Sequence, residues 1–172
     1  ILTTGIHGLS KLGFLVQNKI KFDNEFSLTE RLIIKSIEHF CRPRVYPNFL
    51  NNLIKTRSNK KIKRIGCTDS SDGLFQALQD LAIASNCKAI INYEKIPKDK
   101  DWPKGDKWDE YYFFGGEDYE LVFSLPKKWA KNLSKLDKDI NEIGFFADGE
   151  PSIEFKDNKK NKLLNNKPFK HF

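Results

Sequence analysis

One short acidic segment combines residue types that bind cations and phosphate. Residues 68–73 read Thr-Asp-Ser-Ser-Asp-Gly, so two carboxylates, Asp69 and Asp72, stand among hydroxyl groups at the end of a predicted strand and the start of a predicted helix. Carboxylate oxygens suit a hard cation such as Mg²⁺, and the amides of a helix start suit a phosphate. A site for a metal bound to phosphate would use both. The alternative is that Ser71 or Asp72 only caps the helix.

A second acidic segment follows a pair of glycines. Residues 114–121 read Phe-Gly-Gly-Glu-Asp-Tyr-Glu-Leu, and the first acid, Glu117, comes directly after Gly115 and Gly116. Glycine permits a positive φ or a close approach of the backbone to another group. The alternative is a simple left-handed turn before a strand whose acids face water. Both segments border predicted strands, so together they would place carboxylates along one edge of a sheet.

No other group of residues forms a catalytic pattern. His7, His39 and His171 are scattered, and no serine or cysteine stands in a nucleophile-elbow motif, so surface or helical positions are expected for the histidines. Trp102 and Trp108 precede the second acidic segment. They could line a ligand pocket, but packing in the core is the more common use of tryptophan.

The elements that must position these residues alternate between strands and helices. Strands are predicted at residues 1–4, 62–68, 89–93, 119–125, 140–146 and 152–155. Helices are predicted at residues 9–18, 27–42, 47–54, 71–86, 106–113 and 127–136. For the second helix, Ser27 and Glu30 have the spacing of a capping box. This order predicts an α/β or α+β domain with a mixed β-sheet covered by helices.

Composition excludes several classes of protein. The chain has 172 residues with 39% hydrophobic and 31% charged side chains, which indicates one folded domain and not a disordered chain. The net charge of +7 is uneven, because residues 67–126 contain 6 basic and 12 acidic side chains. The most basic tract, residues 55–64, is either a phosphate or nucleic-acid contact or, more commonly, an exposed loop. Because the acidic motifs lie elsewhere, nucleic acid is not the expected partner.

Cysteine usage and hydropathy bear on the cellular compartment. The three cysteines have no CxxC spacing, so neither a disulfide framework nor a cysteine zinc site is expected. No apolar run is long enough for a membrane span, and residues 1–13 lack the features of a signal peptide. We therefore expect a cytoplasmic protein. The chain has no methionine and opens on a strand-like segment, which suggests a piece of a longer protein.

The chain resembles the C-terminal part of the thiamine-monophosphate kinases, in the aminoimidazole ribonucleotide synthetase-like superfamily. That family has the motifs D-x-S-D-G-L, G-G-E-D-Y-E-L and a closing G-aromatic-x-H-F. Here they stand at residues 69–74, 115–121 and 168–172. The third motif departs from the family at Pro168, where the family has glycine, and at Phe169, where it has Tyr or Trp. The resemblance covers nearly the whole chain.

The resemblance implies Mg²⁺-dependent transfer of the γ-phosphoryl group of ATP to thiamine monophosphate, giving thiamine diphosphate. It makes Asp69 and Asp72 ligands of Mg²⁺, Ser71 a contact to ATP, and Glu117 and Phe169 contacts to thiamine monophosphate. It also implies that residues 1–172 are one C-terminal domain, and that an N-terminal domain with most Mg²⁺ and nucleotide ligands is absent from this chain. The complete enzyme would be a homodimer, and this part alone would be inactive.

Two other functions remain open at this point. Another ATP-dependent member of the superfamily, related to aminoimidazole ribonucleotide or selenophosphate synthetases, would share the architecture. A non-enzymatic binding module would use the basic tract at residues 55–64. The amino-acid sequences of the second and third motifs favour the kinase.

Overall fold

The computed structural model describes residues 1–19, 28–57 and 65–165. Within these ranges the strands are β1 (Leu2–Thr4), β2 (Gly66–Asp69), β3 (Lys88–Ile91), β4 (Leu121–Ser124), β5 (Ile140–Glu142), β6 (Gly144–Ala147) and β7 (Ser152–Phe155). The helices are α1 (Leu9–Gln17), α2 (Glu30–Cys41), α3 (Phe49–Lys55), α4 (Gly73–Ser85), α5 (Asp106–Phe114) and α6 (Lys127–Leu136), with 3-10 helices at Tyr93–Lys95 and Asn158–Asn165. The predicted α/β class is confirmed.

The strands form two sheets instead of the single predicted sheet. One sheet has the order β2-β4-β1-β5, and its neighbouring strands are antiparallel. The other has the order β6-β3-β7, with β3 antiparallel to β6 and parallel to β7. In the first sheet Asp69 at the end of β2 lies opposite Leu121 at the start of β4, which brings the two acidic segments to the same edge.

The division into two sheets occurs where one long strand was predicted. Residues 140–146 do not form a continuous strand, because the chain bends at Ile143 and passes from the first sheet to the second. The amides of Ile143 and Gly144 both donate to the carbonyl of Ile1, at 3.0 and 3.4 Å. A Cβ at position 144 would overlap the carbonyl oxygen of Ile90. The glycine therefore allows β6 to approach β3 closely.

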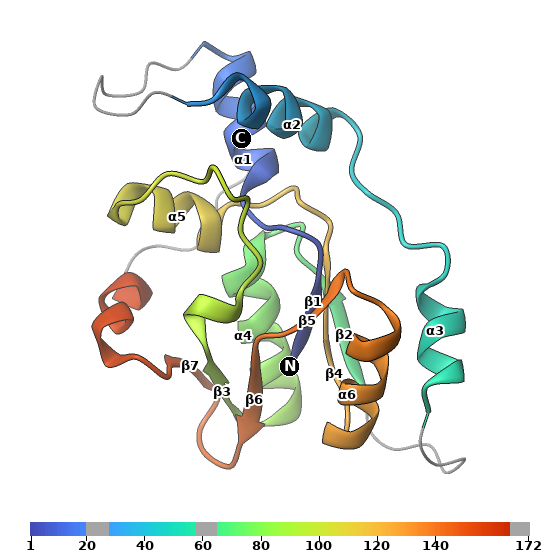
Figure 1. Cartoon of the computed structure of the whole chain (residues 1–172). Helices are drawn as coiled ribbons and strands as arrows, with labels where there is room; N and C mark the ends of the chain where they lie inside the picture. Colours follow the sequence, from blue (N-terminus) through green and yellow to red (C-terminus); the bar gives the residue numbers. More distant parts are fainter. Residues whose placement is uncertain (20–27, 58–64, 166–172) are drawn as a thin grey trace.

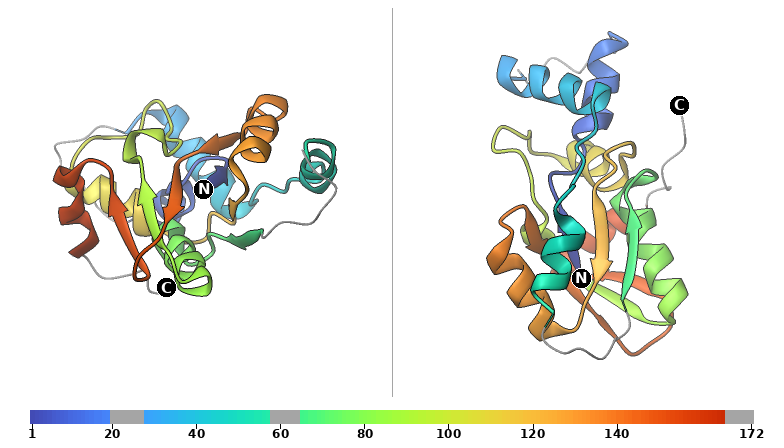
Figure 2. Two further views of the ribbon diagram at one scale, coloured as in Figure 1. Left: turned by 90° about the horizontal axis from the view of Figure 1, so that it is seen from below. Right: turned by 90° about the vertical axis from the view of Figure 1, so that its right-hand side faces the viewer.

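The helices cover the sheets from different sides (Figure 1). Helix α4 turns an apolar face inward and contacts α5, β2 and β7 in the larger of two hydrophobic clusters. Helices α3 and α6 lie together beside the four-stranded sheet, where Trp129 of α6 donates to the carbonyl of Leu53 at 2.9 Å. Helices α1 and α2 pack against each other at one end of the molecule (Figure 2).

The loop before the second acidic segment packs into the core. Trp102 and Trp108 are buried, with their rings nearly perpendicular and their centroids 6.0 Å apart. The indole N–H of Trp102 donates to the carbonyl of Trp108 at 3.3 Å. The interpretation of these tryptophans as core residues is therefore confirmed. Within the described ranges, no helix is both long and apolar enough to cross a membrane.

The start of α2 differs from the predicted capping box. The helix begins at Glu30, and its N-cap is Thr29, whose hydroxyl oxygen accepts from the amide of Leu32 at 3.2 Å. The same hydroxyl donates to Asp101 at 3.0 Å, which ties the helix start to the loop after β3. Glu30 is thus the first residue of the helix. A capping box requires the glutamate at the third helical position, so Glu30 does not form one. Ser27 lies outside the described residues.

We expect Thr29→Ala to lower the free energy of unfolding by about 1 kcal/mol, the usual effect of removing an N-cap oxygen. Thr29→Ser is the matched control, because it keeps the oxygen and should stay within a few tenths of a kcal/mol of the parent. Urea unfolding of the three proteins measures the difference. Equal stability of the two variants would show that the hydroxyl does not cap α2.

Candidate functional site

The first acidic segment forms a tight turn between β2 and α4. Asp69 is the last residue of β2, and its carboxylate accepts a hydrogen bond from the amide of Ser71 at 2.9 Å. Asp72 occupies the N-cap position of α4, but its side chain makes no capping hydrogen bond. Both aspartates are exposed. The alternative that Asp72 is present only to cap the helix is therefore not supported by the geometry.

In the second acidic segment, Gly115 lies in close contact with the end of α5 and with α1. A Cβ at Gly115 would overlap the carbonyl oxygen of Tyr111 and lie 2.8 Å from Cβ of Lys11, so a close approach explains this glycine. The left-handed residues are not the glycines but Glu117, with φ of 68°, and Tyr119, with φ of 54°. The expected left-handed turn exists, but it lies after the glycine pair.

Backbone hydrogen bonds join the two segments directly. The amide of Glu117 donates to the carbonyl of Ser71 at 2.8 Å, and the amide of Ser70 donates to the carbonyl of Glu120 at 2.9 Å. The buried hydroxyl of Ser70 accepts from the amide of Glu120 at 3.1 Å. Gly73, with φ of 91°, packs so closely that a Cβ would lie 2.9 Å from the carbonyl oxygen of Phe114. The fold therefore holds the two motifs in a fixed relative position.

Exposed Asp69 and Asp72 and half-buried Glu117 all influence one tyrosine, Tyr119. The hydroxyl of Tyr119 donates to the carboxylate of Glu117 at 2.7 Å. This hydrogen bond raises the pKa of Tyr119, as do partial burial and the negative charges of Glu117, Asp69 and Asp72. The three carboxylates therefore lie close enough to Tyr119 to raise its pKa. We call Asp69, Asp72, Glu117 and Tyr119 the acidic edge.

The acidic edge fits a metal that brings other ligands with it. Within the described ranges, no group of three or more His, Cys, Asp or Glu side chains is close enough to hold a metal ion. Mg²⁺ commonly binds one or two carboxylates and completes its shell with water and substrate phosphates. Exposed carboxylates such as Asp69 and Asp72 suit that arrangement, and a closed metal cage does not.

An apolar cavity opens beside the acidic edge. Its volume is about 500 Å³, and Tyr119 and Leu121 line it together with Val45 of the connection from α2 to α3 and Phe49 at the start of α3. Phe169, which the sequence analysis assigned to the same ligand as Glu117, lies outside the described residues.

The other two acids of the second segment point inward. Asp118 and Glu120 are buried, so the acids of residues 117–120 do not all face water as the simple-turn alternative required. Asp118 accepts from the amides of Gly8 at 2.6 Å and Ser10 at 2.9 Å and thereby caps the N-terminus of α1. Burial raises the pKa of Asp118 to about 6, against the lowering effects of His39 and the two amides.

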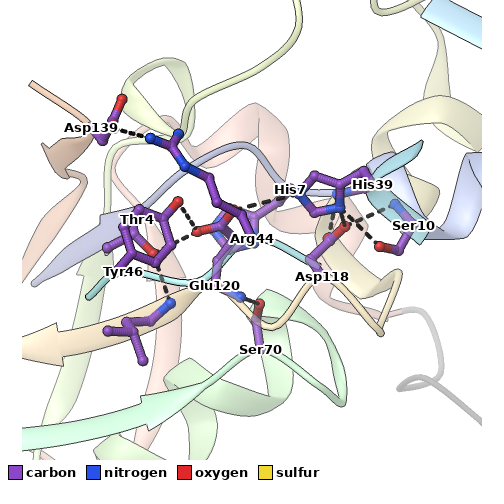
Figure 3. A network of polar contacts seen from close by, with 12 residues as sticks. Thr4, His7, Ser10, His39, Arg44, Tyr46, Ser70, Asp118, Glu120 and Asp139 are labelled. Carbon is purple, nitrogen blue, oxygen red and sulfur yellow. Dashed lines mark hydrogen bonds and ion pairs between the residues drawn. The ribbon is translucent and has the colours of Figure 1, made fainter. Parts of the chain in front are cut away.

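Glu120 connects the acidic segment to two other parts of the chain. Its Oε2 accepts hydrogen bonds from the hydroxyls of Thr4 and Tyr46, each at 2.6 Å (Figure 3). Burial alone would raise its pKa, but His39 and these two hydroxyls lower it overall, so Glu120 is ionised at neutral pH. The sequence analysis did not identify these inward acids. Strand alternation could not have found them, because Glu117 and Tyr119 have left-handed and not extended backbone.

Two of the histidines meet at these buried acids. His39 lies 3.7 Å from Asp118 and 3.5 Å from Glu120, and its Nδ1 is 3.0 Å from the hydroxyl of Ser10. His7 is fully buried, and burial lowers its pKa to about 4. His7 and His39 are therefore not scattered in space, although nothing places them at the acidic edge. His171 lies outside the described residues.

Comparisons with known proteins identify relatives along the full length of the chain. No family profile matches. The thiamine-monophosphate kinase of Prochlorococcus marinus is 31% identical over 172 residues, which cover 100% of this chain and 52% of the kinase. The kinase of Nitrosopumilus maritimus is 33% identical and matches 100% of this chain and 53% of its own length. The chain is therefore homologous to part of the thiamine-monophosphate kinases. It spans about half the length of these relatives.

Solved structures agree with this relationship. The structure of AaThiL complexed with AMPPCP and TMP matches 99% of this chain and 50% of that protein, with a TM-score of 0.71 and 27% identity. The HypE-HypF complex matches 91% of this chain with a TM-score of 0.56 at 15% identity, which shows the fold alone. The chain has the aminoimidazole ribonucleotide synthetase-like fold that these thiamine-monophosphate kinase and HypE structures share.

Proposed function

We propose that this chain is part of a thiamine-phosphate kinase that transfers the γ-phosphoryl group of ATP to thiamine monophosphate. The observation that carries the proposal is the homology to named kinases over the whole chain, including the two motifs that form the acidic edge. The structure of AaThiL with AMPPCP and TMP supports the same two substrates. Because the chain spans about half of its relatives, the other half would complete the site.

The three carboxylates of the acidic edge, and Ser71 beside them, have roles that their chemistry allows. Asp69 and Asp72 would bind Mg²⁺, which neutralises the charge that develops on transferring phosphoryl groups. Ser71, between them, would contact ATP near the start of α4, where backbone amides favour phosphate. The carboxylate of Glu117 would bind the cationic thiazolium or the aminopyrimidine of the acceptor. We assign no catalytic acid or base to this chain, since phosphoryl transfer depends mainly on positioning and electrostatics.

Several parts of this proposal concern the complete protein. Phe169 would stack on a cationic ring of the acceptor, as aromatic rings do with cations. Its replacement of Tyr or Trp would retain stacking and lose a hydrogen-bonding group. We further propose that residues 1–172 are a C-terminal domain, that an N-terminal domain supplies the remaining Mg²⁺ and ATP ligands, and that the complete enzyme is a cytoplasmic homodimer. Neither a synthetase nor a nucleic-acid-binding function is favoured by a specific observation.

Phosphoryl transfer measured with γ-labelled ATP and thiamine monophosphate tests the proposal. The purified 172-residue chain should give no thiamine diphosphate, because it holds only one side of the site. A protein that joins this chain to the other half of a related kinase should form it in the presence of Mg²⁺. Turnover by the isolated chain, free of host enzyme, would contradict the half-site interpretation. A folded but inactive joined protein would contradict the proposed function.

A further inference from the structure

A second cavity lies on the inward side of the second acidic segment, away from the acidic edge. Its volume is about 230 Å³, enough for roughly seven water molecules at about 30 Å³ each. It is bounded by the loop after β1, by α2, by the connection after α2 and by the segment between α6 and β5. Its polar lining residues are Lys35, His39, Arg44, Glu120, Lys138, Asp139 and Asn141.

A buried carboxylate oxygen without a hydrogen-bond donor lies at this cavity. The Oε2 atom of Glu120 is fully engaged by Thr4 and Tyr46, whereas Oε1 accepts no hydrogen bond. Nε2 of His39 lies 3.5 Å from this oxygen, beyond the usual hydrogen-bond length. Glu120 is only 1% exposed. A buried, ionised oxygen without a donor is costly, so a donor supplied by a ligand would be stabilising.

Glycine at position 5 lets the backbone pass directly beside this oxygen. Gly5 lines the cavity, and a Cβ built on it would overlap Oε1 of Glu120. Gly5 also has φ of 48°, which residues with side chains rarely adopt. The carboxylate of Glu120 therefore packs directly against the backbone at the cavity wall, and a side chain at position 5 would displace it.

The rest of the lining is mainly basic. Lys35 is held by Asp99 at 2.7 Å, and Arg44 pairs with Asp139 (Figure 3). Lys138 differs from both, because no acidic side chain in the described parts of the chain forms an ion pair with it. The cavity therefore offers a hydrogen-bond acceptor at Glu120 and an uncompensated positive charge at Lys138.

We propose that this cavity binds a small carboxylate that carries an amino or hydroxyl group, with the donor group at Glu120 and the carboxylate near Lys138. The donor would satisfy Oε1, and a charge-assisted hydrogen bond to a carboxylate is about twice as strong as a neutral one. The carboxylate would balance the positive lining. This site shares no residue with the acidic edge and does not depend on the proposed kinase function.

A matched series of three-carbon probes tests the proposal on the 172-residue chain. β-Alanine, 3-hydroxypropionate and propionate share a carboxylate and differ in the group at the other end, while propylamine lacks the carboxylate. Backbone amide shifts in a titration followed by NMR would report binding at Gly5, Leu9 and His39. We expect propionate, which lacks the donor, to bind at least about tenfold more weakly than the better donor-bearing carboxylate, the effect of losing one hydrogen bond to a charged group. Propylamine, which lacks the carboxylate, should bind about threefold more weakly, as expected for the loss of one exposed charge contact.

Comparison of β-alanine with 3-hydroxypropionate shows whether the ligand's hydrogen-bond donor is an amino group or a hydroxyl group. Tighter binding of β-alanine would identify an amino acid-like ligand, and tighter binding of 3-hydroxypropionate a hydroxy acid. Equal binding of all four probes, or no shifts at these residues up to the solubility limit, would overturn the proposal and leave a cavity that holds only water.

Two variants locate the ligand. Glu120→Gln should weaken the better probe by about tenfold, with circular dichroism as the check that the fold is retained. Lys138→Ala should weaken it by about threefold, as expected for one exposed charge. Lys135→Ala is the matched control, because Lys135 is an exposed lysine of α6 that does not line the cavity. Equal losses for Lys138→Ala and Lys135→Ala would indicate non-specific attraction and overturn the site.

Discussion

Asp72→Asn should lower kcat by on the order of 10² to 10³ in an enzyme that joins this chain to the other half of a related kinase, the usual effect of removing one preorganised electrostatic group. Asparagine keeps the size of aspartate but loses the charge proposed to hold Mg²⁺ against phosphate. Stability should change by well under about 1 kcal/mol, because asparagine is as good an N-cap residue as aspartate. The exposed side chain of Asp72 also makes no capping hydrogen bond.

Ser71→Ala is the matched comparison for this prediction. It removes a neutral hydroxyl from the neighbouring residue, so its effect on kcat should be smaller than that of Asp72→Asn. Steady-state kinetics at saturating ATP over a Mg²⁺ titration, with a melting curve for each variant, separates activity from stability. Near-normal turnover of Asp72→Asn, or a melting temperature far below the parent, would mean that Asp72 is a structural residue.

Local patterns were sufficient to predict most elements. The helix over residues 127–136 and the strand over residues 152–155 have the predicted bounds, since a regular apolar pattern and flanking Pro or Gly define them. The error at residues 140–146 has a different cause. Ile140, Ile143, Phe145 and Phe146 favour a strand, whereas the break at Ile143 involves hydrogen bonds to Ile1, at the other end of the chain. Local sequence does not contain that information.

The candidate site shows the same limit. The sequence identified Asp69, Asp72 and Glu117 because acids beside glycines at predicted strand ends can be recognised without knowledge of the fold. It did not show that Ser70, between the two aspartates, is buried and bonded to Glu120. It also could not show that Asp118 and Glu120 point away from the acidic edge toward His7 and His39, because those contacts depend on how α1 and α2 pack.

Two buried groups, His7 and Asp118, should make opposite contributions to the pH dependence of stability. The pKa of His7 is lowered from 6.5 to about 4, so the unfolded state binds more protons and stability falls as the pH drops from 6.5 toward 4. The pKa of Asp118 is raised from 3.8 to about 6, so the folded state binds more protons and its contribution is lost as the pH rises through 6. Each contribution is about 3 kcal/mol at its full extent, and between pH 4 and 6 they largely cancel.

Single substitutions of His7 and Asp118 should therefore reveal how each residue changes stability with pH. Relative to the parent, Asp118→Asn should lose about 3 kcal/mol more stability on acidification from pH 6.5 to 4, because the opposing contribution of Asp118 no longer offsets that of His7. His7→Gln, whose amide can still meet the hydroxyl of Thr3, should gain about as much over the same range. Urea unfolding across this pH range measures both slopes, and any constant loss from the altered hydrogen bonds shifts the curves without changing their slopes. Parallel curves for the parent and both variants would show that neither group has a shifted pKa in the folded protein.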